Sequence, residues 1–241
     1  MSQAALICVQ ALNKVFGLRP ALRSVSFEIA RGELVALLGA NGSGKTTLLR
    51  ILAALSKPSS GTVTIGGWQL PREAYAVRGH LGVVTHLPLL YDELTAAENL
   101  RLYARLYNLP HELSKGDLEA RIRESLARVG LLKRADDRVR TFSRGMQQRL
   151  ALARATLHSP DILLLDEPYT GLDAQGSALL DSLIADWHAQ GRTIIAALHD
   201  LSRAAALCRR ALILADGKLA ADLPMPDAPI LTETFNALNP S

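Results

Sequence analysis

One stretch of the sequence passes from an apolar segment through a glycine-rich turn directly into a helical pattern. Residues 33–38 (Glu-Leu-Val-Ala-Leu-Leu) are predicted to form a strand that is buried on both faces. Residues 39–46 contain three glycines, and leucine and isoleucine then recur at helical spacing over 48–55. Fully buried strands that lead into helices are typical of parallel sheets covered by helices, so this feature predicts an α/β fold.

The rest of the chain continues the alternation of short apolar runs and helical patterns. Further strands are predicted at 24–29, 62–65, 81–84, 162–165, 193–197 and 211–214. No strand is expected between 95 and 158, and helices are predicted there at 97–107, 117–129 and 145–158. We therefore expect one domain over residues 1–241. Its predicted parts are a core with a β subdomain (1–86 and 159–222), a helical subdomain (87–158) and an irregular, proline-containing tail (223–241).

Composition limits the classes of protein to which the chain can belong. Of its 241 residues, 49% are hydrophobic and 21% are charged, as in ordinary globular chains, which excludes a wholly disordered protein. The net charge of +4 is explained by solubility alone, although it also suits an anionic partner. Cys8 and Cys208 lie far apart and predict reduced thiols without a metal site. No apolar run approaches the roughly 20 residues that span a bilayer, so no direct membrane insertion is expected.

The turn at 39–46, Gly-Ala-Asn-Gly-Ser-Gly-Lys-Thr, fits the phosphate-binding pattern G-x-x-x-x-G-K-[ST]. Its glycines let successive backbone N–H groups converge on phosphate oxygens, towards which the following helix points its positive end. Lys45 can reach the β- and γ-phosphates, and the hydroxyl of Thr46 can bind Mg²⁺. The predicted nucleotide-binding residues of this segment are Gly39, Asn41, Gly42, Ser43, Gly44, Lys45, Thr46 and Thr47.

The apolar strand predicted at 162–165 ends in two carboxylates, Asp166 and Glu167. The carboxyl ends of strands are where open α/β sheets bind ligands. Taken alone, such a pair is also explained as a helix cap or the solvated end of a loop. Beside a phosphate-binding loop, Asp166 is predicted to hold Mg²⁺, and Glu167 to polarise the water that attacks the γ-phosphate.

Residues 142–149 read Phe-Ser-Arg-Gly-Met-Gln-Gln-Arg. Ser143 at the start of a helix could by itself be only an N-cap. In a chain that also carries the glycine-rich turn and the carboxylate pair, however, the segment resembles the Leu-Ser-Gly-Gly-Gln signature of ATP-binding-cassette (ABC) ATPases. Residues 168–173 resemble the D-loop of that family, His199 its switch histidine, and Phe16 the aromatic residue that stacks on adenine. The resemblance runs from about residue 12 to 219, nearly the whole chain.

The resemblance implies a P-loop NTPase fold with a RecA-like core, an antiparallel β subdomain and an inserted α-helical subdomain. It also implies a head-to-tail homodimer that holds two ATP molecules with Mg²⁺ between its subunits. Each ATP would lie on the Lys45 loop of one copy, with Glu167 and His199 as catalytic residues, and would be capped by the signature of the other copy. The residues expected to act in trans are Ser143, Arg144, Gly145, Gln147 and Asp173.

Two positions depart from the family pattern. His86 stands where a glutamine is usual, between the strand at 81–84 and the helical region. An imidazole can contact Mg²⁺ or water, but it titrates near neutrality, so His86 is expected as a stand-in whose sensing role is open. Arg144 replaces the first signature glycine, and it either adds a cation near the trans site or points into solvent.

The spacing of the motifs narrows the choice among ABC proteins. Relatives that act on DNA carry a long coiled-coil insertion, for which the stretch between Thr46 and Ser143 is too short, so no nucleic acid is expected as a partner. A single cassette without a membrane span resembles the ATPase subunit of a transporter, bound to separate membrane subunits on the cytoplasmic side of the cell membrane. Residues 87–91 would then help to form a groove for those subunits, or else pack within the helical subdomain.

Residues 85–107 resemble the haem-exporter ATPase of bacterial cytochrome c maturation. Other small exporter ATPases, for drugs, lipids or polysaccharides, share much of this pattern. A switch protein that remodels a non-transport complex is the remaining alternative. Nothing in the chain predicts a haem ligand, so any substrate preference is expected to belong to the membrane subunits.

Overall fold

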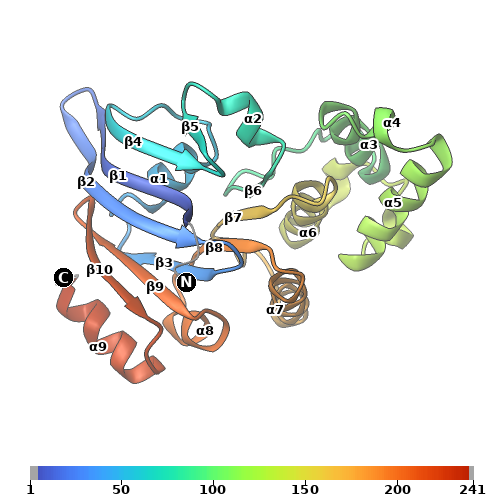
Figure 1. Cartoon of the computed structure of the whole chain (residues 1–241). Coiled ribbons are helices and arrows are strands. Elements are labelled where there is room, and N and C mark those ends of the chain that lie inside the picture. Colours follow the sequence, from blue (N-terminus) through green and yellow to red (C-terminus); the bar gives the residue numbers. More distant parts are fainter. Residues whose placement is uncertain (1–4, 239–241) are drawn as a thin grey trace.

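The computed structural model describes residues 5–238, which form two β-sheets and a group of helices to one side (Figure 1). The larger sheet has the order β10-β9-β3-β8-β7-β6, and all its neighbours run parallel except β10, which is antiparallel to β9. Its strands are β3 (Leu34–Gly39), β6 (Leu81–Val84), β7 (Ile162–Asp166), β8 (Thr193–Ala197), β9 (Arg210–Ala215) and β10 (Lys218–Pro224). Every residue of β3, β7 and β8 is buried, as the unbroken apolar runs predict for a sheet covered on both faces.

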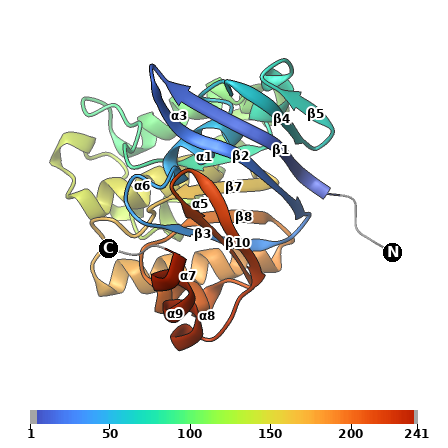
Figure 2. The same ribbon diagram turned by 90° about the vertical axis from the view of Figure 1, so that its left-hand side faces the viewer.

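The smaller sheet is antiparallel and has the order β2-β1-β4-β5. Its strands are β1 (Ala5–Phe16), β2 (Arg19–Ala30), β4 (Ser60–Ile65) and β5 (Trp68–Leu70). Figure 2 shows this sheet on one side of the larger sheet, with α7 (Ala174–Ala189), α8 (Leu201–Leu207) and α9 (Ala228–Leu238) on the other. The helix α1 (Lys45–Leu52) packs its apolar residues into the hydrophobic core that the two sheets share.

The helical region lies between β6 and β7 in the chain. It contains α3 (Ala96–Leu106), α4 (Leu109–Glu112), α5 (Lys115–Arg128), two short 3₁₀ turns (Leu132–Arg134 and Val139–Thr141) and α6 (Arg144–Thr156), whereas α2 (Ala74–Arg78) precedes β6. Side chains fix the starts of these helices: Thr95 and Glu98 form a capping box at α3, and Ser114 caps α5. A second hydrophobic core joins these helices to the opposite face of the large sheet.

The expectation of an α/β fold with an antiparallel sheet and a helical insertion is confirmed. The strands and helices predicted from the sequence occur within a few residues of their expected positions. The division at 87 and 158 stays a prediction, although the described residues between those positions form no strand beyond a single bridge from Thr95 to Arg138. Among residues 5–238, no helix has the length and apolar character required to cross a membrane.

The prediction of an irregular tail from 223 onwards is wrong for most of that segment. Residues 223 and 224 complete β10, and 228–238 form α9, whose Leu231 is fully buried against the core. The prolines do not prevent this helix, because Pro226 precedes it and Pro229 lies in its first turn, where a missing N–H breaks no helical hydrogen bond. Residues 239–241 lie outside the part that the structure describes.

A candidate nucleotide site at the carboxyl ends of four strands

The glycine-rich loop after β3 has a backbone that larger residues would not tolerate. Gly39 has a φ of 152°, and a Cβ there would lie 2.4 Å from the Oγ of Ser43. Gly44 has a φ of 108°, and its Cβ would lie 2.7 Å from the carbonyl oxygen of Ala21. Gly44 also precedes α1 without a side-chain cap, which leaves the first N–H groups of that helix available to an anion.

Lys45 lies buried against the loop that precedes it. Its Nζ donates hydrogen bonds to the carbonyl oxygens of Gly39 (2.7 Å) and Ala40 (3.0 Å). Burial lowers the pKa of Lys45, whereas the negative charges of Glu167 and Asp166 act in the opposite direction. The ammonium therefore lies within the electrostatic reach of both carboxylates.

Ser43 holds a second buried polar group in this loop. Its side chain is 4% exposed, and its Oγ has no hydrogen-bond partner among the described residues. A buried hydroxyl without a partner carries a free-energy cost, which a bound oxyanion would remove by accepting its hydrogen. The loop is therefore built to receive an anion.

Asp166, the last residue of β7, lies beside the start of α1. The Thr46 hydroxyl donates to its Oδ1 at 3.3 Å. Burial raises the pKa of Asp166, and the hydrogen bond from Thr46 acts against this shift. A hydroxyl and a carboxylate oxygen are hard ligands of the kind that Mg²⁺ prefers, so this pair fits the cation expected from the sequence.

His86 lies at the end of β6, close to the same pair. A small pocket of about 130 Å³ brings its ring together with Thr46 and Asp166, and the charge of a protonated His86 lowers the pKa of Asp166. The other residues around this pocket are Arg50, Leu55, Thr85, Leu87 and Leu89. The structure thus brings His86 next to Thr46 and Asp166, the predicted ligands of Mg²⁺.

Glu167 and His199 meet at the ends of the neighbouring strands β7 and β8. The Nε2 of His199 lies 2.8 Å from Oε1 of Glu167. Glu167 has a φ of 51°, an uncommon conformation for a non-glycine residue, and its backbone N–H donates to the carbonyl oxygen of Ala197. The two side chains border a pocket of about 280 Å³. The backbone at Glu167 is therefore held in a specific conformation next to the histidine.

Three further residues support this pocket without having been predicted. The hydroxyl of Tyr169 donates to Oδ1 of Asp181 at 2.6 Å, and Arg203 pairs with the same carboxylate at 3.1 Å. The guanidinium of Arg203 also lies 4.2 Å from the centre of the Tyr169 ring. Asp181 and Arg203 carry no motif, so only the ion pair that joins α7 to α8 reveals them.

The signature residues lie apart from this site within the chain. Ser143 is exposed and caps α6, with its Oγ accepting from the N–H of Met146 at 3.2 Å. Arg144 is also exposed, and a Cβ on Gly145 would lie 2.8 Å from the carbonyl oxygen of Gly171. None of the residues that border the pockets beside Thr46 and Glu167 comes from 143–147.

The remaining predicted residues occupy the rim of the loop or other surfaces. Asn41 and Gly42 are exposed, and Thr47 is half-buried in α1. Phe16, at the end of β1, is 54% exposed, with the Nζ of Lys14 lying 4.8 Å from its ring centre. Gln147 is half-buried in α6, and Asp173 caps α7 by accepting from the N–H of Gly176 at 2.7 Å.

Comparison with known proteins gives consistent matches over most of the chain. The profile of the family described as "ABC transporter" matches residues 22–170. NatA, an ABC transporter ATP-binding protein of Bacillus subtilis, is 38% identical over 200 residues, which cover 83% of this chain and 80% of NatA. The Nod factor export ATP-binding protein I of Paraburkholderia xenovorans is 36% identical over 229 residues, covering 95% of this chain and 74% of that protein.

Solved structures resemble the chain in its fold as well. An ATP-binding subunit of an ABC transporter superposes with a TM-score of 0.86 at 29% identity, covering 96% of this chain and 99% of the other. A dimeric ATP-binding cassette in a post-hydrolysis state, bound to ADP and phosphate, has a TM-score of 0.83 at 28% identity, covering 91% and 99%.

Proposed function

The chain belongs to the ATP-binding subunits of ABC transporters, a family of ATP hydrolases, and from this premise we propose how its residues act. Two copies close around Mg-ATP and thereby drive separate membrane subunits of an exporter. The observation that carries this proposal is the convergence of the Lys45 loop, the Thr46–Asp166 pair and the Glu167–His199 pair at neighbouring strand ends.

The binding step uses groups that the loop already holds in place. The phosphates of ATP replace the carbonyl oxygens of Gly39 and Ala40 as partners of the Lys45 ammonium, and they accept from the hydroxyl of Ser43. Thr46 and Asp166 would hold Mg²⁺, with His86 beside them. A bound Mg²⁺ would neutralise charge on the phosphate oxygens. The exposed ring of Phe16 provides a face on which adenine stacks.

The hydrolytic step falls to Glu167 and His199. The oxygen of a water molecule attacks the γ-phosphorus as the bond to the β–γ bridging oxygen breaks, and Glu167 accepts the proton that this water loses. The hydrogen bond from His199 fixes the orientation of the Glu167 carboxylate. The pocket beside these two side chains is also bordered by Tyr169 and Arg203. Both are held in place by hydrogen bonds to the carboxylate of Asp181.

The second half of each site comes from another copy of the chain. Ser143 and Gly145 at the exposed start of α6, joined by Arg144 and Gln147, would face the γ-phosphate held by the partner. We assign Asp173 to the same surface, because the start of α6 lies close to the loop that precedes Asp173. A Cβ on Gly145 would lie only 2.8 Å from the carbonyl oxygen of Gly171 in that loop. The solved dimeric cassettes of similar fold support this arrangement.

The docking surface for membrane subunits lies beside His86. Leu55, Leu87, Leu89 and Tyr91 are large apolar side chains that are 46–59% exposed. Three of them border the small pocket next to the Mg²⁺ ligands, so a partner bound there would sense the nucleotide through His86. This surface would attach the chain to the cytoplasmic side of a membrane.

The identity of the exported substrate is the most specific part of the proposal. The resemblance of residues 85–107 favours haem export in cytochrome c maturation. Relatives named for Nod factor export and linearmycin resistance favour an exporter of lipid-like or drug-like molecules as the second candidate. A non-transport switch is the least favoured alternative, because these relatives are named for export or resistance.

Recovery of the chain from native membranes tests the docking surface and the substrate class together. The unmodified chain should co-purify with multi-span membrane subunits, whereas Leu87→Asp should lose them. Ile230→Asp is a matched control, because it adds the same charge at a similarly exposed position on α9. Recovery only with soluble partners would contradict the transporter assignment, and co-purified subunits that export no haem from vesicles would contradict the haem proposal.

A further inference from the structure

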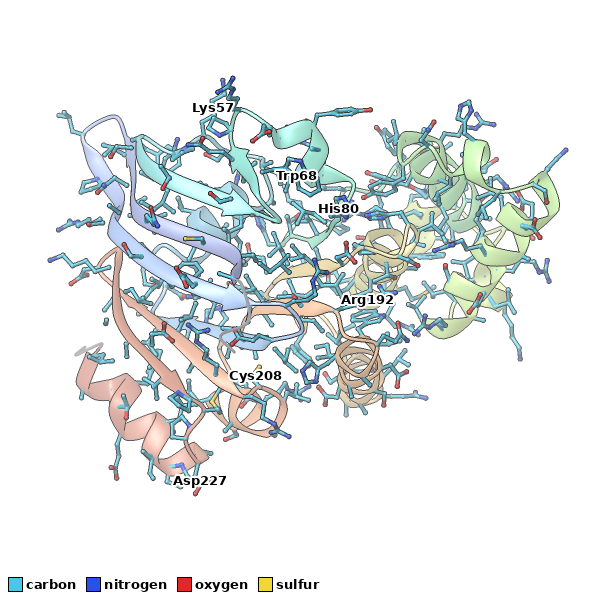
Figure 3. The ribbon with its side chains drawn as sticks, in the orientation of Figure 1. Lys57, Trp68, His80, Arg192, Cys208 and Asp227 are labelled. Atoms are coloured by element: carbon cyan, nitrogen blue, oxygen red, sulfur yellow. The ribbon has the colours of Figure 1, made fainter. Side chains whose placement is uncertain are left out.

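A pocket of about 390 Å³ lies well away from the nucleotide loop, between the helical region and the core. It is bordered by α5, by the turn after α6, by α7 and by Arg192, the residue that precedes β8. Figure 3 shows Arg192 in this middle region, between the sheets and the outer helices. Pockets of this size hold small organic ligands.

Two of the residues that border this pocket carry a buried donor atom that has no partner among the described residues. Trp187 is 2% exposed, and its Nε1 makes no hydrogen bond. The Nη1 of Arg192 is also buried and unpaired. An N–H group that is removed from water and left without an acceptor is costly, so the wall of the pocket at these two residues is short of hydrogen-bond acceptors.

Three guanidinium groups border the same space. Burial lowers the pKa of Arg192, and the positive charges of Arg128 and Arg121 lower it further, so these cations repel one another across the pocket. Arg121 is fixed by hydrogen bonds to the carbonyl oxygen of Leu157 (2.6 Å) and to Oγ of Ser159 (2.5 Å). Arg128 forms no ion pair with any described residue.

The acidic residues nearby neutralise only part of this charge, because two carboxylates, Asp117 and Glu124, border the pocket beside three guanidinium groups. Asp117 accepts a hydrogen bond from the hydroxyl of Ser114 at 2.6 Å, and Glu124 lies exposed on α5. Asp161 attracts Arg192, but its Oδ2 lies 2.9 Å from Nδ1 of His80. The pocket therefore keeps an excess of positive charge and of hydrogen-bond donors.

We infer that this pocket binds a small organic phosphate. The phosphoryl group would accept from the guanidinium groups of Arg192 and Arg128, since guanidinium groups match the paired oxygens of a phosphate. The pocket is larger than one phosphate ion requires, and Leu113, Val129 and Leu183 offer apolar surface to the organic part. Because the residues come from α5 and α7, the bound molecule would hold these two helices together. This inference does not depend on the proposed transport function.

The test uses the full chain carrying Trp68→Phe, which leaves Trp187 as the only tryptophan. Ribose 5-phosphate and inorganic phosphate are titrated calorimetrically, with Trp187 emission followed in parallel and ribose as the ligand control. We expect both phosphates to bind and shift the emission, ribose 5-phosphate at the lower concentration, and ribose to do neither.

Arginine variants then locate the binding. Arg192→Gln should weaken ribose 5-phosphate binding by about tenfold or more, as the loss of a charge-assisted hydrogen bond predicts. The exposed Arg128→Gln should act in the same direction and covers the case in which the buried variant does not fold. Arg123→Gln on the same helix, outside the pocket, is the matched control and should change little.

Three results would overturn the inference. One is an absence of ribose 5-phosphate binding to the Trp68→Phe chain. Another is binding that survives both Arg192→Gln and Arg128→Gln, because the nucleotide loop would then be its site. The third is an equal loss in Arg123→Gln, which would reduce the effect to net charge.

Discussion

The starts of α1 and α6 carry the two motifs that define this chain, yet they are built in opposite ways. Before α1, the loop leaves the first N–H groups without a side-chain cap and buries Lys45 and the unpaired hydroxyl of Ser43. At α6, Ser143 is exposed and satisfies its own helix through the N–H of Met146. The first site is incomplete without an anion, whereas the second is locally complete and faces outwards.

This difference shows how one chain can hold half of a shared site. The loop at α1 carries the cost of one unpaired buried hydroxyl, that of Ser43, which the phosphates of the proposed nucleotide would offset on binding. The start of α6 carries no such cost, so it can present its helix N-terminus to a ligand held by another molecule. Mutations at the starts of α1 and α6 should therefore differ in the property that they change as well as in the size of the change.

The largest effect is expected from Glu167→Gln, which removes the proton acceptor but keeps the shape of the side chain. Turnover should fall by about 10²–10⁴-fold, with nucleotide affinity retained. Steady-state ATPase assays and nucleotide-binding titrations measure the two quantities. Glu93→Gln, on an exposed loop, is the control. Unchanged turnover would remove Glu167 as the base.

A smaller loss, in binding, is expected from Lys45→Ala. The ammonium contributes charge-assisted hydrogen bonds to the phosphates, so affinity for Mg-ATP should fall by roughly 10–100-fold. Titration with a fluorescent ATP analogue measures this, with the exposed Lys57→Ala as control. Undiminished affinity would mean that the loop does not hold the nucleotide.

At α6, Ser143→Arg should block hydrolysis in trans. Mixing it with Lys45→Ala chains, at an ATP concentration too low for either variant to turn over alone, should restore activity to a level a few-fold below wild type, since each mixed dimer has one intact pair of motifs. Ser114→Arg, at the comparable cap of α5, controls for loss of a helix cap. If Ser143→Arg alone is fully active, or if mixing restores nothing, the shared site is wrong.

The smallest effect concerns stability at the far end of α6. His158 stacks on Tyr107 at 3.7 Å and contacts the carbonyl oxygen of Leu81 through Nε2 at 3.1 Å; burial lowers its pKa to about 4. The unfolded chain binds the proton more readily, so stability should fall as the pH drops from about 6.5 towards 4.

Denaturant unfolding should reveal about 1 kcal/mol less stability from this residue at pH 5.5 than at pH 7.5. His158→Gln should remove that part of the pH dependence, whereas the exposed His111→Gln should retain it. An identical pH profile in wild type and His158→Gln would show that this histidine is protonated without cost in the folded state.

Parts of the fold were harder to predict where local patterns are broken. The strand β1 was not expected, because Ala11, with a φ of 46°, and the register shift between Val9 and Leu12 interrupt its alternation. The helix α9 was not expected, because its segment contains prolines. Proline is compatible with a helix only in the first turn, which is where Pro229 lies. His158 belongs to no motif, and only the structure shows that it is half-buried against Tyr107.

The sequence by itself determined the residues whose chemistry depends on neighbours along the chain: the glycine-rich loop, the carboxylate pair at the end of β7 and the cap at Ser143. Only the tertiary structure decided which distant groups meet, such as Thr46 with Asp166, Tyr169 with Asp181 and Arg203, and Arg192 with α5. The reason is that loop and helix-cap geometry follow from local backbone preferences, whereas contacts across the sheet depend on the strand order and on the packing of both cores.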